Sequence, residues 1–249
     1  MTGNSGSPED SVRKTAERKR RMDKEWEYYN HALIPTTAPH VVPDTSWMKD
    51  SKSWRKLAEG KHPLFARWTT DFDCEEETQW WYCIKDEPFD LSSLKYKRRR
   101  VISQGLRWVE VKLILPYEYS EQMADIHIAA RLGYGDVLDI ETEKKTLVQG
   151  FDAIKDQNAT GNREYIGAFM RETGEMIGYG VYEIYEDWVD QSVIKTHPEY
   201  LKYNVNAAMV YFAIERYMNG NFPIKYISNG SKNISHKTKP RNSGILDKN

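Results

Sequence analysis

The strongest constraint on the fold is a succession of strand signals between Tyr165 and Gly230, with very short connections. Three segments are rich in β-branched and aromatic residues: 165–170, 176–185 and 188–196. Residues 171–175 have turn composition, so the first two segments are predicted to form a hairpin. Pro198 ends the third segment, because proline cannot donate a hydrogen bond to a strand ladder.

A helix and a last strand complete this pattern. From Val205 to Ala213, apolar residues recur at the spacing of a helix that lays one face on a sheet. Gly220 is expected to end the helix, and residues 224–228 are expected to form a short strand. The predicted order is therefore β-β-β-α-β.

This order resembles the core of the GNAT acyltransferase superfamily. The resemblance implies an α/β (α+β) fold with a mixed, mostly antiparallel central sheet flanked by helices. It also implies that acetyl-coenzyme A or another acyl-coenzyme A donates its acyl group to an amine acceptor. In the family, the loop between the third strand and the helix cradles the pyrophosphate of coenzyme A. A helix start suits phosphate because it offers unpaired N–H groups and a partial positive charge.

The resemblance places the donor site on the third strand and the following loop and helix: Val193, Ile194, Tyr203, Asn204, Val205, Asn206 and Ala207. The family pattern Q/R-x-x-G-x-G/A falls on Leu201, Asn204 and Asn206, and none of the three matches. Asn204 is expected to replace the first glycine, because asparagine tolerates left-handed backbone angles. The resemblance assigns the N–H that stabilises the developing oxyanion to residues 192–194.

Direct attack by an amine requires a group that removes its proton. Glu183 and Glu186 are candidate bases, although Glu183 also fits an outward-facing strand position. His236 is a second candidate catalytic residue, and Asn229 and Asn233 are candidate substrate-binding residues. A solvent-facing polar turn explains this last segment equally well. The histidines are too scattered for a metal site, and no metal is expected.

An earlier strand-helix-strand unit carries concentrated positive charge. Strands are predicted at residues 78–85 and 108–115, with a helix at 91–103 that Asp90 caps and Gly105 ends. Its basic residues are Lys95, Lys97, Arg98, Arg99 and Arg100. The unit is similar to the basic helix of FemAB-like members of the superfamily, bacterial transferases that build peptidoglycan cross-bridges. That similarity implies aminoacyl-tRNA as an alternative donor in cell-envelope synthesis, and a solvated helix face is an equally good interpretation.

The remaining segments suggest four regions: a disordered basic extension (1–21), a cap segment rich in aromatic residues and proline (22–69), the GNAT-like domain (70–238) and a polar tail (239–249). Two further helices are expected at residues 117–131 and 141–154. GNAT-like domains continue beyond the strand at 224–228 with a helix and two strands. The sequence is therefore expected to be C-terminally truncated, with that strand at an exposed sheet edge.

The composition gives no global preference for a partner. The formal net charge is −1, so no overall field attracts nucleic acid or membrane. No membrane span or signal peptide is expected, and the two cysteines suit a reduced cytoplasmic protein. The acceptor is expected to be a small amine, an amino sugar or a peptide. A catalytically silent binding module is the alternative, because the loop glycines are missing.

Overall fold

The computed structural model describes residues 25–72, 80–156, 161–220 and 222–233. The chain divides into two compact units, residues 1–77 and 78–249. Each unit has a hydrophobic core of its own. In these ranges, no helix has both the length and the apolar character that crossing a membrane requires.

The N-terminal unit is a small sheet with two short helical segments. Its elements are β1 (Trp26–Tyr29), β2 (Ala32–Pro35), a 3-10 helix (Ser46–Lys49), α2 (Ser51–Leu57) and β3 (Phe65–Ala66). β1 pairs antiparallel with β2, and β2 pairs parallel with β3. The buried residues Trp26, Leu33 and Ala58 form the core, against which Trp47 and Trp54 pack.

The segment expected to be a cap (22–69) contains this sheet, whose strands the sequence analysis did not predict. The chain reverses at Asn30 and His31, whose φ angles are 44° and 64°. Positive φ at both central residues matches the twist of a tight hairpin, and the sequence Asn-Gly usually provides it. Histidine at the second position, together with strands of only four residues, conceals the hairpin in the sequence.

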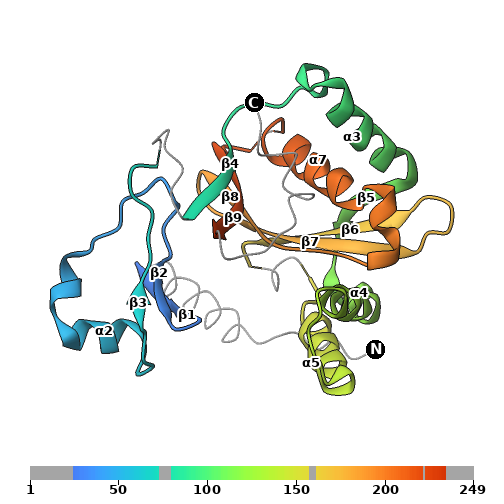
Figure 1. Cartoon of the computed structure of the whole chain (residues 1–249). Helices are drawn as coiled ribbons and strands as arrows, with labels where there is room; N and C mark the ends of the chain where they lie inside the picture. Colours follow the sequence, from blue (N-terminus) through green and yellow to red (C-terminus); the bar gives the residue numbers. More distant parts are fainter. Residues whose placement is uncertain (1–24, 73–79, 157–160, 221, 234–249) are drawn as a thin grey trace. The chain divides into compact units, whose positions relative to one another are not determined.

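The C-terminal unit contains a six-stranded sheet in the order β4-β9-β8-β7-β6-β5 (Figure 1). The strands are β4 (Trp80–Lys85), β5 (Val109–Ile114), β6 (Arg163–Met170), β7 (Met176–Ile184), β8 (Trp188–Thr196) and β9 (Tyr226–Asn233). Only β8 and β9 are parallel neighbours; the other neighbours are antiparallel. The predicted fold class, a mixed and mostly antiparallel sheet flanked by helices, is confirmed.

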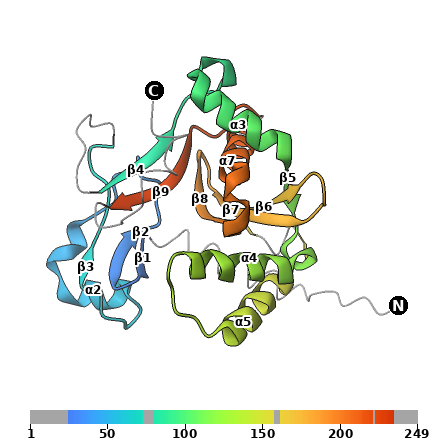
Figure 2. The same cartoon turned by 45° about the vertical axis from the view of Figure 1, so that its right-hand side comes forward.

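Helices cover both faces of this sheet (Figure 2). The helices are α3 (Tyr96–Trp108), α4 (Ser120–Gly133), α5 (Ile140–Asp152) and α7 (Val205–Tyr217). On one face, Met123 and Ile126 of α4 pack against Tyr179 and Val181. On the other face, α7 packs against β6 and β7, and α3 packs against α7. Alternate residues of β7 therefore enter two different cores.

The basic helix differs from its predicted bounds. Asp90 caps a separate 3-10 helix (Leu91–Ser93), and α3 then continues through Gly105 to Trp108. Gly105 is buried, and a Cβ atom added there would lie 2.8 Å from the backbone oxygen of Asn204. Gly105 thus permits the close approach of α3 to the start of α7 instead of ending the helix.

The last strand corrects another expectation. β9 begins two residues later than predicted and extends to Asn233, and it is an interior strand. Its second edge pairs with β4, where Trp81 lies opposite Lys232. A strand from an early part of the sequence therefore covers the edge that was expected to be exposed.

We predict that Gly105→Ala destabilises the C-terminal unit whereas Gly150→Ala does not. Both glycines lie inside helices, so both substitutions gain the same helix propensity. A Cβ at Gly150 meets nothing within 4 Å, whereas at Gly105 it meets the backbone of Asn204. We expect Gly105→Ala to lower the free energy of unfolding by about 1–3 kcal/mol and Gly150→Ala to raise it by up to about 1 kcal/mol. Urea unfolding of both variants measures this difference; equal values would contradict the close packing of α3 on α7.

Candidate functional site

The central feature of the candidate site is the divergence of β8 from β9. The two strands pair only at Trp188↔Tyr226, Val189↔Ile227 and Asp190↔Ser228. Beyond Asp190, β8 continues to Thr196, while β9 continues along β4. In the described part of the chain, this half of β8 has no strand partner on its β9 side. Such an edge presents backbone N–H and C=O groups that an extended ligand can pair with.

A β-bulge lies at the point of divergence. On the β7 side, Val193 pairs with Val181 and Gln191 pairs with Tyr182, so Ser192 is the extra residue. The Ser192 hydroxyl donates to the backbone oxygen of Val181 at 3.3 Å. A bulge changes the phase of side-chain alternation. If side-chain directions are counted from the residues before Ser192, the residues after it therefore point to the opposite faces from those that simple alternation predicts.

Polar residues form a row across four strands on the face covered by α4. Arg163 lies opposite Glu183, Glu183 lies opposite Asp190, and Asp190 lies opposite Ser228. Directly opposed residues share a face and lie close enough to interact. The row thus brings one guanidinium, two carboxyl groups and one hydroxyl together beside the bulge.

Glu183, a predicted catalytic residue, is already bound on both carboxylate oxygens. Its Oε1 accepts a hydrogen bond from Arg163 Nε at 2.9 Å, and Nη2 of the same guanidinium forms an ion pair with it at 2.8 Å. Its Oε2 accepts a hydrogen bond from the Tyr185 hydroxyl at 2.8 Å. The Tyr185 ring is itself stacked on Trp188, with centroids 4.4 Å apart. This arrangement holds a charged carboxylate in place, and the catalytic role of Glu183 stays a prediction.

Asp190 is the residue that sequence reasoning missed. Burial raises the pKa of its carboxyl from the ordinary 3.8 to about 6, although a hydrogen bond with the Ser228 side chain opposes this rise. The negative charge of Glu183 raises the pKa further. Ser228 itself is only 1% exposed. Asp190 itself is half-buried, and a carboxyl whose pKa is raised to about 6 is a candidate proton acceptor.

A second set of side chains meets on the face covered by α7, next to the point where β8 and β9 separate. The Tyr182 hydroxyl donates to Gln191 Oε1 at 3.0 Å, and Gln191 Nε2 donates to Asn229 Oδ1 at 2.8 Å. Asn229, a predicted substrate-binding residue, therefore lies at the divergence of the two strands. Asn233 is the last residue of β9, and His236 lies outside the described residues. The functional roles of these three residues stay predictions.

The predicted donor loop joins β8 to α7. A 3-10 helix (Pro198–Tyr203) leads to Asn204, whose φ of 56° and ψ of 39° are left-handed, as expected for a residue that replaces glycine. No side chain caps the N-terminus of α7. The buried Val205 and Ala207 can offer only backbone groups, while Asn206 Oδ1 accepts the Thr196 hydroxyl. Their binding of coenzyme A stays a prediction.

The other predicted donor residues lie on β8 after the bulge. Val193 packs toward α4, and Ile194 packs toward α7, so the two side chains occupy opposite faces of the sheet. Tyr203 makes an edge contact with Trp108 at 5.9 Å between centroids. Among the residues that the structure describes, no group of three or more His, Cys, Asp or Glu side chains is placed to hold a metal ion.

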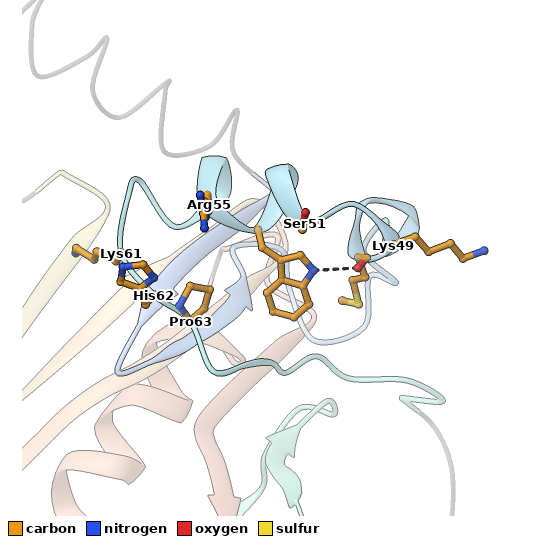
Figure 3. A pocket seen from close by; sticks show the side chains of 8 residues that line it. Lys49, Ser51, Arg55, Lys61, His62 and Pro63 are labelled. Atoms are coloured by element: carbon orange, nitrogen blue, oxygen red, sulfur yellow. Dashed lines mark hydrogen bonds between the residues drawn. The ribbon is translucent and has the colours of Figure 1, made fainter.

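The N-terminal unit contains a separate, open pocket of about 360 Å³ (Figure 3). It is lined by Met48, Lys49, Ser51, Trp54, Arg55, Lys61, His62 and Pro63. Trp54 Nε1 donates to the backbone oxygen of Met48 at 2.9 Å, which fixes the indole. In Figure 3 the Lys49 side chain points away from the other labelled residues. The charged residues of the pocket are exposed, and no chemistry is assigned to it.

Comparisons with known proteins find similar solved structures only. No protein-family model and no curated protein matches the chain. The C-terminal domain of a protein assigned as a lysylphosphatidylglycerol synthetase, from Agrobacterium fabrum, is 7% identical with a TM-score of 0.48, covering 84% of this chain and 67% of that chain. FemX is 10% identical with a TM-score of 0.48, covering 68% and 57%.

The PaiA N-acetyltransferase of Thermoplasma acidophilum, in complex with coenzyme A, is 14% identical with a TM-score of 0.34, covering 42% of this chain and 69% of that chain. The similarity covers 57% of FemX, which is less than two thirds of its length. Similarity at this level does not assign a function, which has to be argued from the site.

We predict that Asp190→Asn stabilises the protein at neutral pH but not at acidic pH. The native carboxyl, with a pKa of about 6 against an ordinary 3.8, binds its proton more tightly than the unfolded one. The native state therefore loses stability as the pH rises from about 4 to about 6, and by at most about 3 kcal/mol in total. The amide carries no charge and avoids this loss.

Urea unfolding at pH 4.5 and pH 7.5 measures the effect, with the exposed Asp152→Asn as the control. The advantage of Asp190→Asn over the native chain should grow between the two pH values, and that of the control should not. An advantage independent of pH would show that Asp190 is not desolvated.

Proposed function

We propose that the C-terminal unit is a GNAT-like N-acyltransferase that moves an acyl group from acyl-coenzyme A to an amine by direct attack. The observation that carries this proposal is the parallel pair β8–β9, which separates at a bulge. Next to it, β8 leads through the left-handed Asn204 into the uncapped α7. An extended donor can then pair with the free edge of β8 and place its phosphates at the helix start.

The backbone supports phosphate binding without special side chains. α7 has 13 residues, so its N-terminus carries the partial positive charge of a full helix. Left-handed geometry at Asn204 turns the chain directly into the first helical residue, Val205. The glycine of the family pattern provides the same freedom. Asparagine at this position is therefore compatible with a phosphate-binding loop.

Acyl transfer then requires one proton acceptor and one oxyanion donor. The acceptor nitrogen attacks the thioester carbonyl, and its proton passes to Asp190 directly or through water. The C–S bond then breaks and releases the thiolate, which takes up the proton from Asp190 to leave as the thiol. A pKa of about 6 leaves Asp190 ionised at neutral pH yet basic enough to accept a proton. A backbone N–H beside Ser192 is the proposed donor to the oxyanion. In this scheme Glu183 adjusts the basicity of Asp190.

Aminoacyl-tRNA is the second candidate donor, and the basic helix α3 favours it. In the described ranges, the five cationic side chains from Lys95 to Arg100 form no ion pair. Arg99 Nη1 donates only to the backbone oxygen of Ser92, at 3.1 Å. Unpaired arginines on one helix suit a polyphosphate backbone. The acceptor of either donor is proposed to be a small amine, an amino sugar or a peptide.

We predict that acetyl-coenzyme A raises the melting temperature and that Asn204→Asp abolishes this effect. A ligand at 100 times its dissociation constant stabilises a protein by about 2.7 kcal/mol. Aspartate keeps the left-handed preference but adds a negative charge where the pyrophosphate is proposed to bind. Asn204→Gly is the matched control, because it keeps the backbone geometry and adds no charge. Equal shifts of the melting temperature in both variants would place the phosphates elsewhere. If acetyl-coenzyme A does not shift the melting temperature of the folded native chain, and tRNA binds in a way that depends on α3, the second donor is favoured.

We predict that Asp190→Asn lowers kcat by about 10²–10⁴-fold while donor affinity is preserved. Glu183→Gln should act differently, because it removes the charge that raises the pKa of Asp190. The acidic limb of the pH–rate profile should therefore move to lower pH in Glu183→Gln. Thiol release from acetyl-coenzyme A with a panel of amines measures both effects, and Glu172→Gln in the exposed turn is the control. Full activity in Asp190→Asn would refute its role, whereas donor binding without turnover in the native chain would indicate a silent binding module.

A further inference from the structure

Lys195 lies near the end of β8, on the same face as Asp190. It is directly opposite Tyr179 of β7, whose ring packs in the core beneath α4. The bulge at Ser192 creates this arrangement, because simple alternation would put residues 190 and 195 on opposite faces. The rise of a strand, about 3.3 Å per residue, separates the two side chains by about 15 Å. Asp190 and Lys195 thus mark two ends of one surface.

The carboxylates near Lys195 are bound to another cation. Arg131 of α4 donates from Nε to Asp136 Oδ2 at 2.8 Å and from Nη1 to Glu143 Oε1 at 2.8 Å. Among the described residues, no carboxylate lies within ion-pairing distance of Lys195 Nζ. Its close contact is the ring of Tyr134, whose centroid is 5.8 Å away. Lys195 is therefore a half-buried cation without an anionic partner.

His127 of α4 adds an imidazole ring at this place. Its Nδ1 is hydrogen-bonded to the Tyr179 hydroxyl at 2.9 Å, which fixes the ring beside the residue that faces Lys195. Burial lowers the pKa of His127, and the nearby charges of Lys195 and Arg131 lower it further. Burial and Arg131 likewise lower the pKa of Lys195. The charge of Asp136 opposes this effect at Lys195, and that of Glu143 opposes it at His127, but both carboxylates pair directly with Arg131 and not with Lys195.

Lys195 and His127 lie close to the segment between β8 and α7, which carries the proposed donor loop. A Cβ atom added at Gly133, the last residue of α4, would lie 3.1 Å from the Pro198 ring. The end of α4 therefore contacts the segment that joins β8 to α7. A ligand along the free edge of β8 would pass between Asp190 and this contact.

We infer that Lys195 and His127 form a binding position for an anionic group, a phosphate or a carboxylate, carried by a substrate of the β8 site. The inference rests on the proposed function for the identity of that substrate. An anion would supply the partner that Lys195 lacks, and a charge-assisted hydrogen bond to a half-buried ammonium is stronger than one in water. The group could belong to the donor, as a phosphate of coenzyme A, or to the acceptor, as an acid about 15 Å from its amine.

The test uses inorganic phosphate and acetate as probes on the full chain, followed through the ring signals of His127 in NMR spectra. Lys195→Met removes the charge and keeps the length, and Lys195→Arg restores the charge. Lys145→Met, an exposed residue of α5, is the matched control. In the native chain we expect the chemical shifts of His127 to change saturably as the probe is added. The affinity for the probe should be about tenfold weaker in Lys195→Met and close to native in the other two variants. Native melting curves confirm that each variant is folded.

The source of the anionic group follows from a second titration with coenzyme A and with pantetheine, which lacks the phosphates. Weaker binding of coenzyme A but not of pantetheine in Lys195→Met assigns the group to the donor. Unchanged binding of coenzyme A, with phosphate or acetate binding lost, assigns it to the acceptor. If phosphate or acetate binding depends on Lys195 but the protein does not bind coenzyme A, the proposed donor is wrong and the anion site is supported. No saturable change in the native chain, or equal binding in Lys195→Met, would overturn the inference.

Discussion

The arrangement of the candidate site depends on the unequal pairing of β8. At its start, this strand is hydrogen-bonded on both sides, to β7 and to β9. From Ser192 onward, within the described part of the chain, it keeps only β7, while β9 continues in pairing with β4. A parallel pair that separates leaves backbone groups free inside a sheet rather than at its outer edge. The bulge at Ser192 makes this possible, since it lets β8 bend without losing its pairing with β7.

The same bulge determines which side chains can act together. It brings Asp190 and Lys195 to one face, while Gln191 and Ile194 turn to the other. On the α4 face, Arg163 neutralises Glu183, and Asp190 is left as the carboxyl whose charge depends on pH near neutrality. A carboxyl in a partly desolvated position costs stability when it is ionised. The proposed reaction would use the same property of Asp190, because a raised pKa favours proton acceptance.

Local patterns were sufficient to predict the strands from residue 176 to 196 and the helix that starts at Val205, because their composition and periodicity are strong. The pairing of β4 with β9 could not be predicted, since its partners are far apart in the sequence and share no local signal. Asp190 was missed for a different reason. Its raised pKa depends on burial and on Glu183 and Ser228 of the neighbouring strands, and the sequence does not reveal the register that brings these residues together.

The packing of α3 connects the basic helix to the proposed donor loop. Because Gly105 has no side chain, α3 approaches the backbone oxygen of Asn204, which also accepts the Ala208 N–H in the first turn of α7. The left-handed residue is therefore held by a helix as well as by its own backbone preference. A loop that is fixed before the ligand arrives loses less conformational entropy on binding. Under the proposed function, this packing would let a loop without the glycines of the GNAT pattern keep the left-handed geometry at Asn204.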